Sequence, residues 1–145
     1  MASTWDKLKQ SERAGKKDTS RFAGIPKSAP GLLKAQRLGE KASRFGLDWN
    51  TTTGVMDKIK EELAEFEEAH ESGDARSAES EFGDLLFTLV NLARHMGFDA
   101  ENAIGTANRT FEKRARLVET VVDQTHDQSP ASIDALWTAA KKEHP

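Results

Sequence analysis

Two pairs of acidic side chains could carry chemistry in this 145-residue chain: Glu62 with Glu65, and Glu81 with Asp84. Within each pair the residues are three positions apart, which places both side chains on one face of a helix. Carboxylate oxygens are the ligands that Mg²⁺ and Mn²⁺ prefer. The spacing therefore predicts a site for hard divalent cations, built from two neighbouring helices.

The apolar pattern around the acids supports this interpretation. On a helical wheel of about 100° per residue, Glu62 falls inside the apolar stripe of its segment and Glu81 borders that of the next. A carboxylate turned toward a core is costly unless it is paired, protonated or bound to a cation. No matching set of Lys or Arg is expected on the same faces, so a metal would explain the acids. Their acidic neighbours are typical of a solvated helix face (Glu61, Glu67, Glu68 and Glu79).

Apolar residues at helical spacing predict an all-α protein, and no segment has a convincing strand pattern. Helices are expected at about residues 30–45, 55–71, 76–96, 100–122 and 130–142. Ser28 is expected to cap the first of these, and Asp99 the fourth. Gly46 and Gly97 are expected to end helices, whereas Gly83, inside a helix, suggests a close approach of two helices.

The chain is expected to form one domain from residue 24 to residue 145, after a flexible N-terminal segment of residues 1–23. Trp5 could anchor a short helix there. The net charge of −3 gives no general attraction to nucleic acid or to an anionic membrane. No apolar run approaches the roughly 20 residues of a membrane span, so the cytoplasm is the expected location.

Basic side chains near the ends of the helices suggest what the acids bind. Lys58, Arg114 and Lys141 could neutralise phosphate oxygens that the metal does not reach. In the helix at 100–122, Asn108 and Arg114 are the polar groups best aimed inward. Taken alone, spacing predicts a metal-dependent helical protein that acts on phosphate esters.

Several segments together resemble one family. EELAE at 61–65 followed by EFGD at 81–84 is similar to the metal motif of the MazG-type nucleoside triphosphate pyrophosphohydrolases. The resemblance continues in the same order through most of the chain, in GIPKSAPGLLKAQRLGEKASRFGLDW (24–49), GDLLFTLVNLARHMG (83–97), ANRTFEKR (107–114) and LWTAAK (136–141). It is strongest with the catalytic C-terminal domain of two-domain bacterial members.

The resemblance implies an all-α bundle whose core is completed by a second subunit, as a homodimer or homotetramer. It also implies hydrolysis of NTPs or dNTPs to the monophosphate and pyrophosphate with Mg²⁺, or Mn²⁺ as a substitute, in a house-cleaning role for the nucleotide pool. Metal-activated water would attack a phosphorus of the triphosphate, and pyrophosphate would leave.

The same resemblance assigns roles to individual residues. The metal ligands would be Glu62, Glu65, Glu81 and Asp84, with Glu61 and Glu62 as the catalytic carboxylates. Substrate would contact Lys58, Asn91, Asn108, Arg114, Trp137 and Lys141, with Trp137 facing the base or sugar. Thr110 stands where relatives often carry Lys, which puts one phosphate contact in doubt.

Three alternatives stay open at this stage. A di-iron bundle would need two Glu-x-x-His motifs, and the chain has only the one that ends at His70; His70 and His95 fit surface or satisfied core positions better. A non-catalytic dimerisation or adaptor module would use the same amphipathic helices without any metal. A pyrophosphatase specific for dUTP or dCTP would share the metal motif.

Overall fold

The computed structural model describes residues 18–145. The expected helix near Trp5 and most of the expected flexible N-terminal segment therefore lie outside the described residues.

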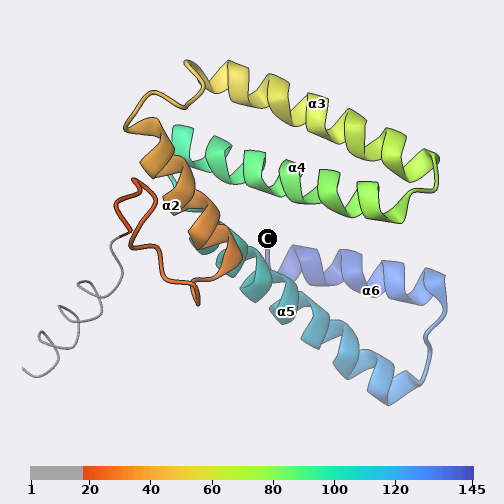
Figure 1. The fold of residues 1–145 in the computed structure, drawn as a ribbon. Coiled ribbons are helices and arrows are strands. Elements are labelled where there is room, and N and C mark those ends of the chain that lie inside the picture. Colours follow the sequence, from red (N-terminus) through yellow and green to blue (C-terminus); the bar gives the residue numbers. More distant parts are fainter. Residues whose placement is uncertain (1–17) are drawn as a thin grey trace, which may run out of the picture. The chain divides into compact units, whose positions relative to one another are not determined.

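Every regular element of the described chain is a helix (Figure 1), which confirms the predicted all-α class. None of these helices has the length and the apolarity that crossing a membrane requires. The predicted helix boundaries are close to the observed ones, although the fourth helix continues three residues past its expected end. The helices are α2 (Gly31–Ser43), α3 (Thr52–Glu71), α4 (Ala75–His95), α5 (Ala100–Thr125) and α6 (Pro130–Glu143).

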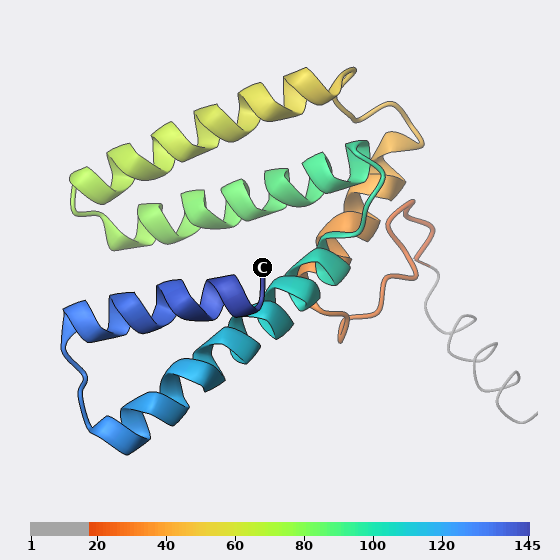
Figure 2. The same ribbon diagram turned by 180° about the vertical axis from the view of Figure 1, so that it is seen from behind.

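The described chain divides after Met96 into two compact units. In the first, α3 and α4 run antiparallel side by side, and α2 packs against α4, as both ribbon views show (Figures 1 and 2). The reversal between α3 and α4 is tight because Gly73 adopts a positive φ of 76°. The most buried apolar side chains of this unit are Val55, Ala69, Val90 and Ala93.

Short polar side chains begin most of these helices. Thr51 accepts a hydrogen bond from the Gly54 amide (3.1 Å), Asp74 accepts one from Ser77 (3.1 Å), and Asp99 caps α5 as predicted. The predicted cap at Ser28 is wrong. Pro30 occupies the N-cap position of α2 without a side-chain hydrogen bond, and its fixed φ already suits entry into the helix.

The predicted close approach at Gly83 is also wrong. A Cβ built there meets no other atom within 4 Å, whereas the close contact lies at Gly39 of α2. A Cβ at Gly39 would overlap Oδ1 of Asn91 and would lie 3.1 Å from Nε of Arg94. Glycine is therefore required where α2 crosses α4.

The second unit is the α5–α6 pair. The rings of Phe111 and Trp137 lie 5.4 Å apart, and Ala140 is buried. Two large apolar side chains of α5 are nevertheless exposed, Ile104 and Phe111, the latter by 61 %. Within its own unit, α5 has only α6 to pack against, so much of its apolar stripe stays uncovered.

Candidate active site

The antiparallel pairing of α3 and α4 brings three acids together. Each of Glu62, Glu81 and Asp84 offers one carboxylate oxygen, and these oxygens all lie within 4.8 Å of one another. Glu62 is only 6 % exposed, Glu81 is half-buried and Asp84 is exposed. The acid cluster therefore extends from the buried side of the helix pair, at Glu62, to its solvent-exposed side, at Asp84.

Lys58, one helical turn before Glu62, is the cation beside the cluster. Its Nζ lies 2.7 Å from Oε1 of Glu62 and 3.0 Å from Oε1 of the exposed Glu61. The hydrogen bond to Glu62, and then that to Glu61, raises the pKa of Lys58 above its usual range. Glu62 therefore has one cationic partner, Lys58, where no matching set of Lys or Arg was expected for the acids. One ammonium group still cannot balance the whole cluster.

Glu65 lies on α3 beside the cluster but outside the group of three. It is exposed, and the structure does not place its carboxylate among the converging oxygens. Desolvation raises the pKa of Glu65, and the negative charges of Glu62 and Glu81 raise it further, against the opposing effect of Lys58. The negative potential of the cluster therefore extends to Glu65, and a bound cation would relieve it.

The chemistry of this donor set fits a divalent cation. Three carboxylates converge from two helices, the most buried of them has only an ammonium partner, and all the donor atoms are hard oxygens. A buried carboxylate is retained at low cost when a metal neutralises it.

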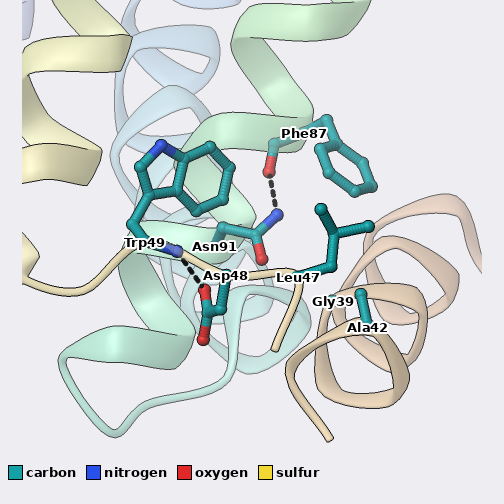
Figure 3. A pocket seen from close by; sticks show the side chains of 7 residues that line it. All are labelled: Gly39, Ala42, Leu47, Asp48, Trp49, Phe87 and Asn91. Atoms are coloured by element: carbon teal, nitrogen blue, oxygen red, sulfur yellow. Dashed lines mark hydrogen bonds between the residues drawn. The ribbon is translucent and has the colours of Figure 1, made fainter. Parts of the chain in front are cut away.

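A pocket of about 310 Å³ opens beside α4, the helix that carries Glu81 and Asp84 (Figure 3). Asn91, expected to contact substrate, lines it and is 2 % exposed. Its Nδ2 donates to the carbonyl oxygen of Phe87 at 3.0 Å. The ring of Trp49 is part of the pocket wall. The lining residues are Gly39, Ala42, Leu47, Asp48, Trp49, Phe87 and Asn91.

Behind the pocket lies an ion-pair network that the sequence analysis missed. Arg94 donates from both terminal nitrogens to Asp48, at 2.9 and 2.6 Å, and His95 Nε2 lies 2.8 Å from the same carboxylate. The hydrogen bonds from Arg94 hold the pKa of Asp48 well below its usual range, with those from His95 and the Trp49 amide adding to the effect. Arg94 and His95 at the end of an apolar helix were a signal that an acidic partner lies nearby. The sequence could not identify that partner, because Asp48 lies 46 residues before Arg94.

The remaining predicted substrate contacts belong to the second unit. Asn108 is exposed rather than inward-facing, and Lys141 is exposed as well. Arg114 donates from Nε to the carbonyl oxygen of His144 at 2.9 Å, and Trp137 packs on Phe111. The structure brings Lys58 to the acids; the approach of these four residues to the acids stays a prediction.

Comparison with known proteins gives a consistent result. Residues 50–118 match the MazG nucleotide pyrophosphohydrolase domain. A nucleoside triphosphate pyrophosphohydrolase of Escherichia coli K12 is 43% identical over 120 residues, which are 81% of this chain and 46% of that protein. The nucleoside triphosphate pyrophosphohydrolase/pyrophosphatase MazG of Thermotoga maritima is 40% identical over 141 residues, 94% of this chain and 54% of that protein. The chain thus spans about half the length of these relatives, and all four predicted metal ligands lie inside the matched domain.

Proposed function

Residues 50–118 make this chain a member of the MazG nucleotide pyrophosphohydrolase family, and from that premise we propose that it hydrolyses nucleoside triphosphates to the monophosphate and pyrophosphate. The observation that carries the proposal is the convergence of Glu62, Glu81 and Asp84 inside the matched domain. The two relatives named for this activity support the reaction class.

We propose Mg²⁺ as the cation, with Mn²⁺ as a substitute, held by Glu62, Glu81 and Asp84 and joined by Glu65. When bound, the ion neutralises phosphate oxygens and lowers the pKa of a water molecule. Glu65 lies next to the cluster on α3 and would complete this set of ligands. Desolvation is the main cause of its raised pKa, and the charges of Glu62 and Glu81 add to it, so a cation at the cluster would favour the ionised form of Glu65.

The chain's own groups position substrate and move the proton. Cleavage to the monophosphate breaks the bond from the α-phosphorus to the bridging oxygen, water supplies the new oxygen, and pyrophosphate leaves with the bond's electron pair. Glu61 is exposed beside Glu62 and hydrogen-bonded to Lys58, so its carboxylate can accept the proton that the water loses. Lys58, which lies beside the same acids, would neutralise phosphate oxygens of the substrate.

Four residues of the second unit complete the proposed substrate contacts. Arg114 and Lys141 would neutralise phosphate oxygens, Asn108 would offer an amide, and Trp137 would face the sugar or base. We also propose a homodimer or homotetramer, a cytoplasmic location and a role in removing unwanted nucleotides. The exposed apolar residues of α3 and α4, among them Leu63 and Leu89, support self-association.

The test is pyrophosphate release from a panel of NTPs and dNTPs with Mg²⁺, for the native protein, Glu62→Gln and Glu67→Gln. Glu67 is an exposed acid of the same helix outside the cluster, so it controls for charge removal. We expect release by the native protein and Glu67→Gln, and a loss of about a hundredfold or more in Glu62→Gln.

Two other outcomes would change the conclusion. No release from any triphosphate, together with no rise of the melting temperature in Mg²⁺, would indicate the adaptor function. Release confined to dUTP or dCTP would indicate a specialised pyrophosphatase.

A further inference from the structure

The pocket beside α4 has walls suited to a flat aromatic group. The indole of Trp49 comes from the segment before α3 and the phenyl ring of Phe87 from α4, while Gly39 and Ala42 line the α2 side (Figure 3). Its volume of about 310 Å³ is at the lower end of small-molecule sites. Aromatic rings in such a wall favour stacking with a heterocycle.

The pocket and the acid cluster lie along one face of one helix. Residues 81, 84, 88, 91 and 95 fall within a single stripe at about 100° per residue. Asn91 follows Asp84 by seven positions, which is about 10 Å along the axis at 1.5 Å per residue. This separation suits a nucleotide whose phosphates lie at the acids and whose heterocycle lies in the pocket. The intervening Thr88 is buried, and its hydroxyl donates to the Asp84 carbonyl oxygen at 2.9 Å.

The polar groups in the pocket wall are already bonded within the chain. Asn91 Nδ2 donates to Phe87, and its Oδ1 accepts from Nε and Nη2 of Arg94 at 3.2 and 3.0 Å. Asp48 accepts hydrogen bonds from Arg94 and from the Trp49 amide. The bond from the Trp49 amide is drawn as a dashed line in Figure 3. These bonds fix the wall, so shape and stacking remain as its means of recognition.

Arg94 holds Asn91 from one side and α2 confines it from the other. The guanidinium is clamped by two hydrogen bonds to Asp48, which limits its own movement. Gly39 leaves just enough room for the carboxamide, since a Cβ there would overlap Oδ1.

We propose that this pocket binds the heterocyclic base of the nucleoside triphosphate, and that Arg94, held by Asp48, is the positioning residue that keeps Asn91 in its wall. The proposal rests on the proposed function for the identity of the ligand. It assigns Trp49 and Phe87 to the base, which leaves the sugar to Trp137.

The first test compares a ligand that has a base with one that has none. Titration calorimetry with Mg²⁺ measures the Kd of α,β-methylene-ATP, which cannot release pyrophosphate, and of inorganic tripolyphosphate. We expect the native protein to bind the ATP analogue more tightly. Trp49→Ala should weaken the analogue roughly ten- to a hundredfold, the usual effect of losing one stacked aromatic, and leave tripolyphosphate unchanged. Phe22→Ala, an exposed aromatic outside the pocket, is the control.

The second test addresses the positioning role. Arg94→Met should weaken the ATP analogue about tenfold and raise KM with little change in kcat, and Arg94→Lys should restore part of the affinity. Arg116→Met removes an exposed arginine–glutamate pair on α5 and should change neither value. If Arg94→Met does not fold, Asp48→Asn probes the same positioning, because it weakens the hydrogen bonds that hold Arg94 and keeps the size of the side chain.

Several results would overturn the proposal. The first is an equal weakening of both ligands in Trp49→Ala. The second is an unchanged affinity for the ATP analogue in both Trp49→Ala and Asp48→Asn. The third is a native protein that binds the analogue no more tightly than tripolyphosphate. Failure of the proposed function is distinguishable. A native protein that binds the analogue through this pocket but releases no pyrophosphate from any triphosphate would refute the hydrolysis and keep the pocket.

Discussion

At the scale of single residues, Lys58 partly neutralises the negative charge of the acid cluster when no metal is bound. Its ammonium group is the cation 2.7 Å from the buried Glu62. A divalent ion on the same carboxylate would repel the ammonium group beside it, so we expect the amine and the metal to compete for Glu62. Lys58 is therefore expected to tune both the stability of the metal-free protein and its affinity for metal.

We predict that Lys58→Met lowers the melting temperature in EDTA and enlarges the rise that Mg²⁺ produces. The first effect follows because Glu62 loses its partner while it stays buried, a loss of roughly 1–3 kcal/mol. Thermal melts with EDTA and with Mg²⁺ measure both. Lys60→Met, an exposed lysine on the same helix, should change neither. An unchanged Mg²⁺ shift in Lys58→Met would show that the amine does not compete with the metal.

Asp48 predicts a dependence of stability on pH. Its hydrogen bonds from Arg94 hold the folded-state pKa below the unfolded value of about 3.9. A depressed pKa stabilises the fold above the unfolded value, and this contribution is lost as the pH falls below about 4 toward the folded-state pKa. Between about pH 7 and pH 3, Asp48→Asn should therefore lose less unfolding free energy than the native protein.

Urea unfolding at the two pH values measures this difference, with Asp57→Asn as the control because that carboxylate is exposed. Equal acid sensitivity of the native protein and Asp48→Asn would show that the network does not stabilise the fold.

At the scale of helices, local sequence predicted much of the fold, because helices depend on spacing and caps within a few residues. Glu62 was placed in the apolar stripe of its helix, and the structure buries it. Contacts between segments could not be read in this way. The pairing of Asp48 with Arg94 joins positions 46 residues apart, and the close approach lies at Gly39 rather than Gly83 because the crossing of α2 with α4 decides which glycine is covered.

The caps give a prediction at this scale. Asp74 accepts hydrogen bonds from the amide and the hydroxyl of Ser77 at the start of α4. Asp74→Ala should cost about 0.5–2 kcal/mol of unfolding free energy, whereas Ser28→Ala should cost almost nothing because α2 begins without it. Urea denaturation compares the two variants. A larger loss in Ser28→Ala would contradict this assignment of the caps.

At the scale of the whole molecule, uncovered apolar surface predicts self-association. Leu63 of α3 and Leu89 of α4 are exposed in the single chain, Leu89 by 42 %. Light scattering after size exclusion should give a mass of two or four times the 16.0 kDa chain. Leu89→Glu should lower this mass, because a charge in an apolar interface is costly to bury.

Circular dichroism should show that Leu89→Glu stays helical. A native protein that is monomeric at micromolar concentration would contradict the proposed assembly and leave the exposed leucines without a role.

Because Asp84 of the acid cluster and Asn91 of the pocket lie on one face of α4, this helix sets the distance between them. Because Asp84 and Asn91 are separated only by helical backbone, the distance from phosphate end to pocket is set by the number of residues between them. Inserting one residue between them would turn Asn91 by about 100° relative to Asp84 and so remove it from the pocket wall. A ligand that binds at both ends as proposed must therefore span a fixed distance, because no loop lies between Asp84 and Asn91 that could adjust it.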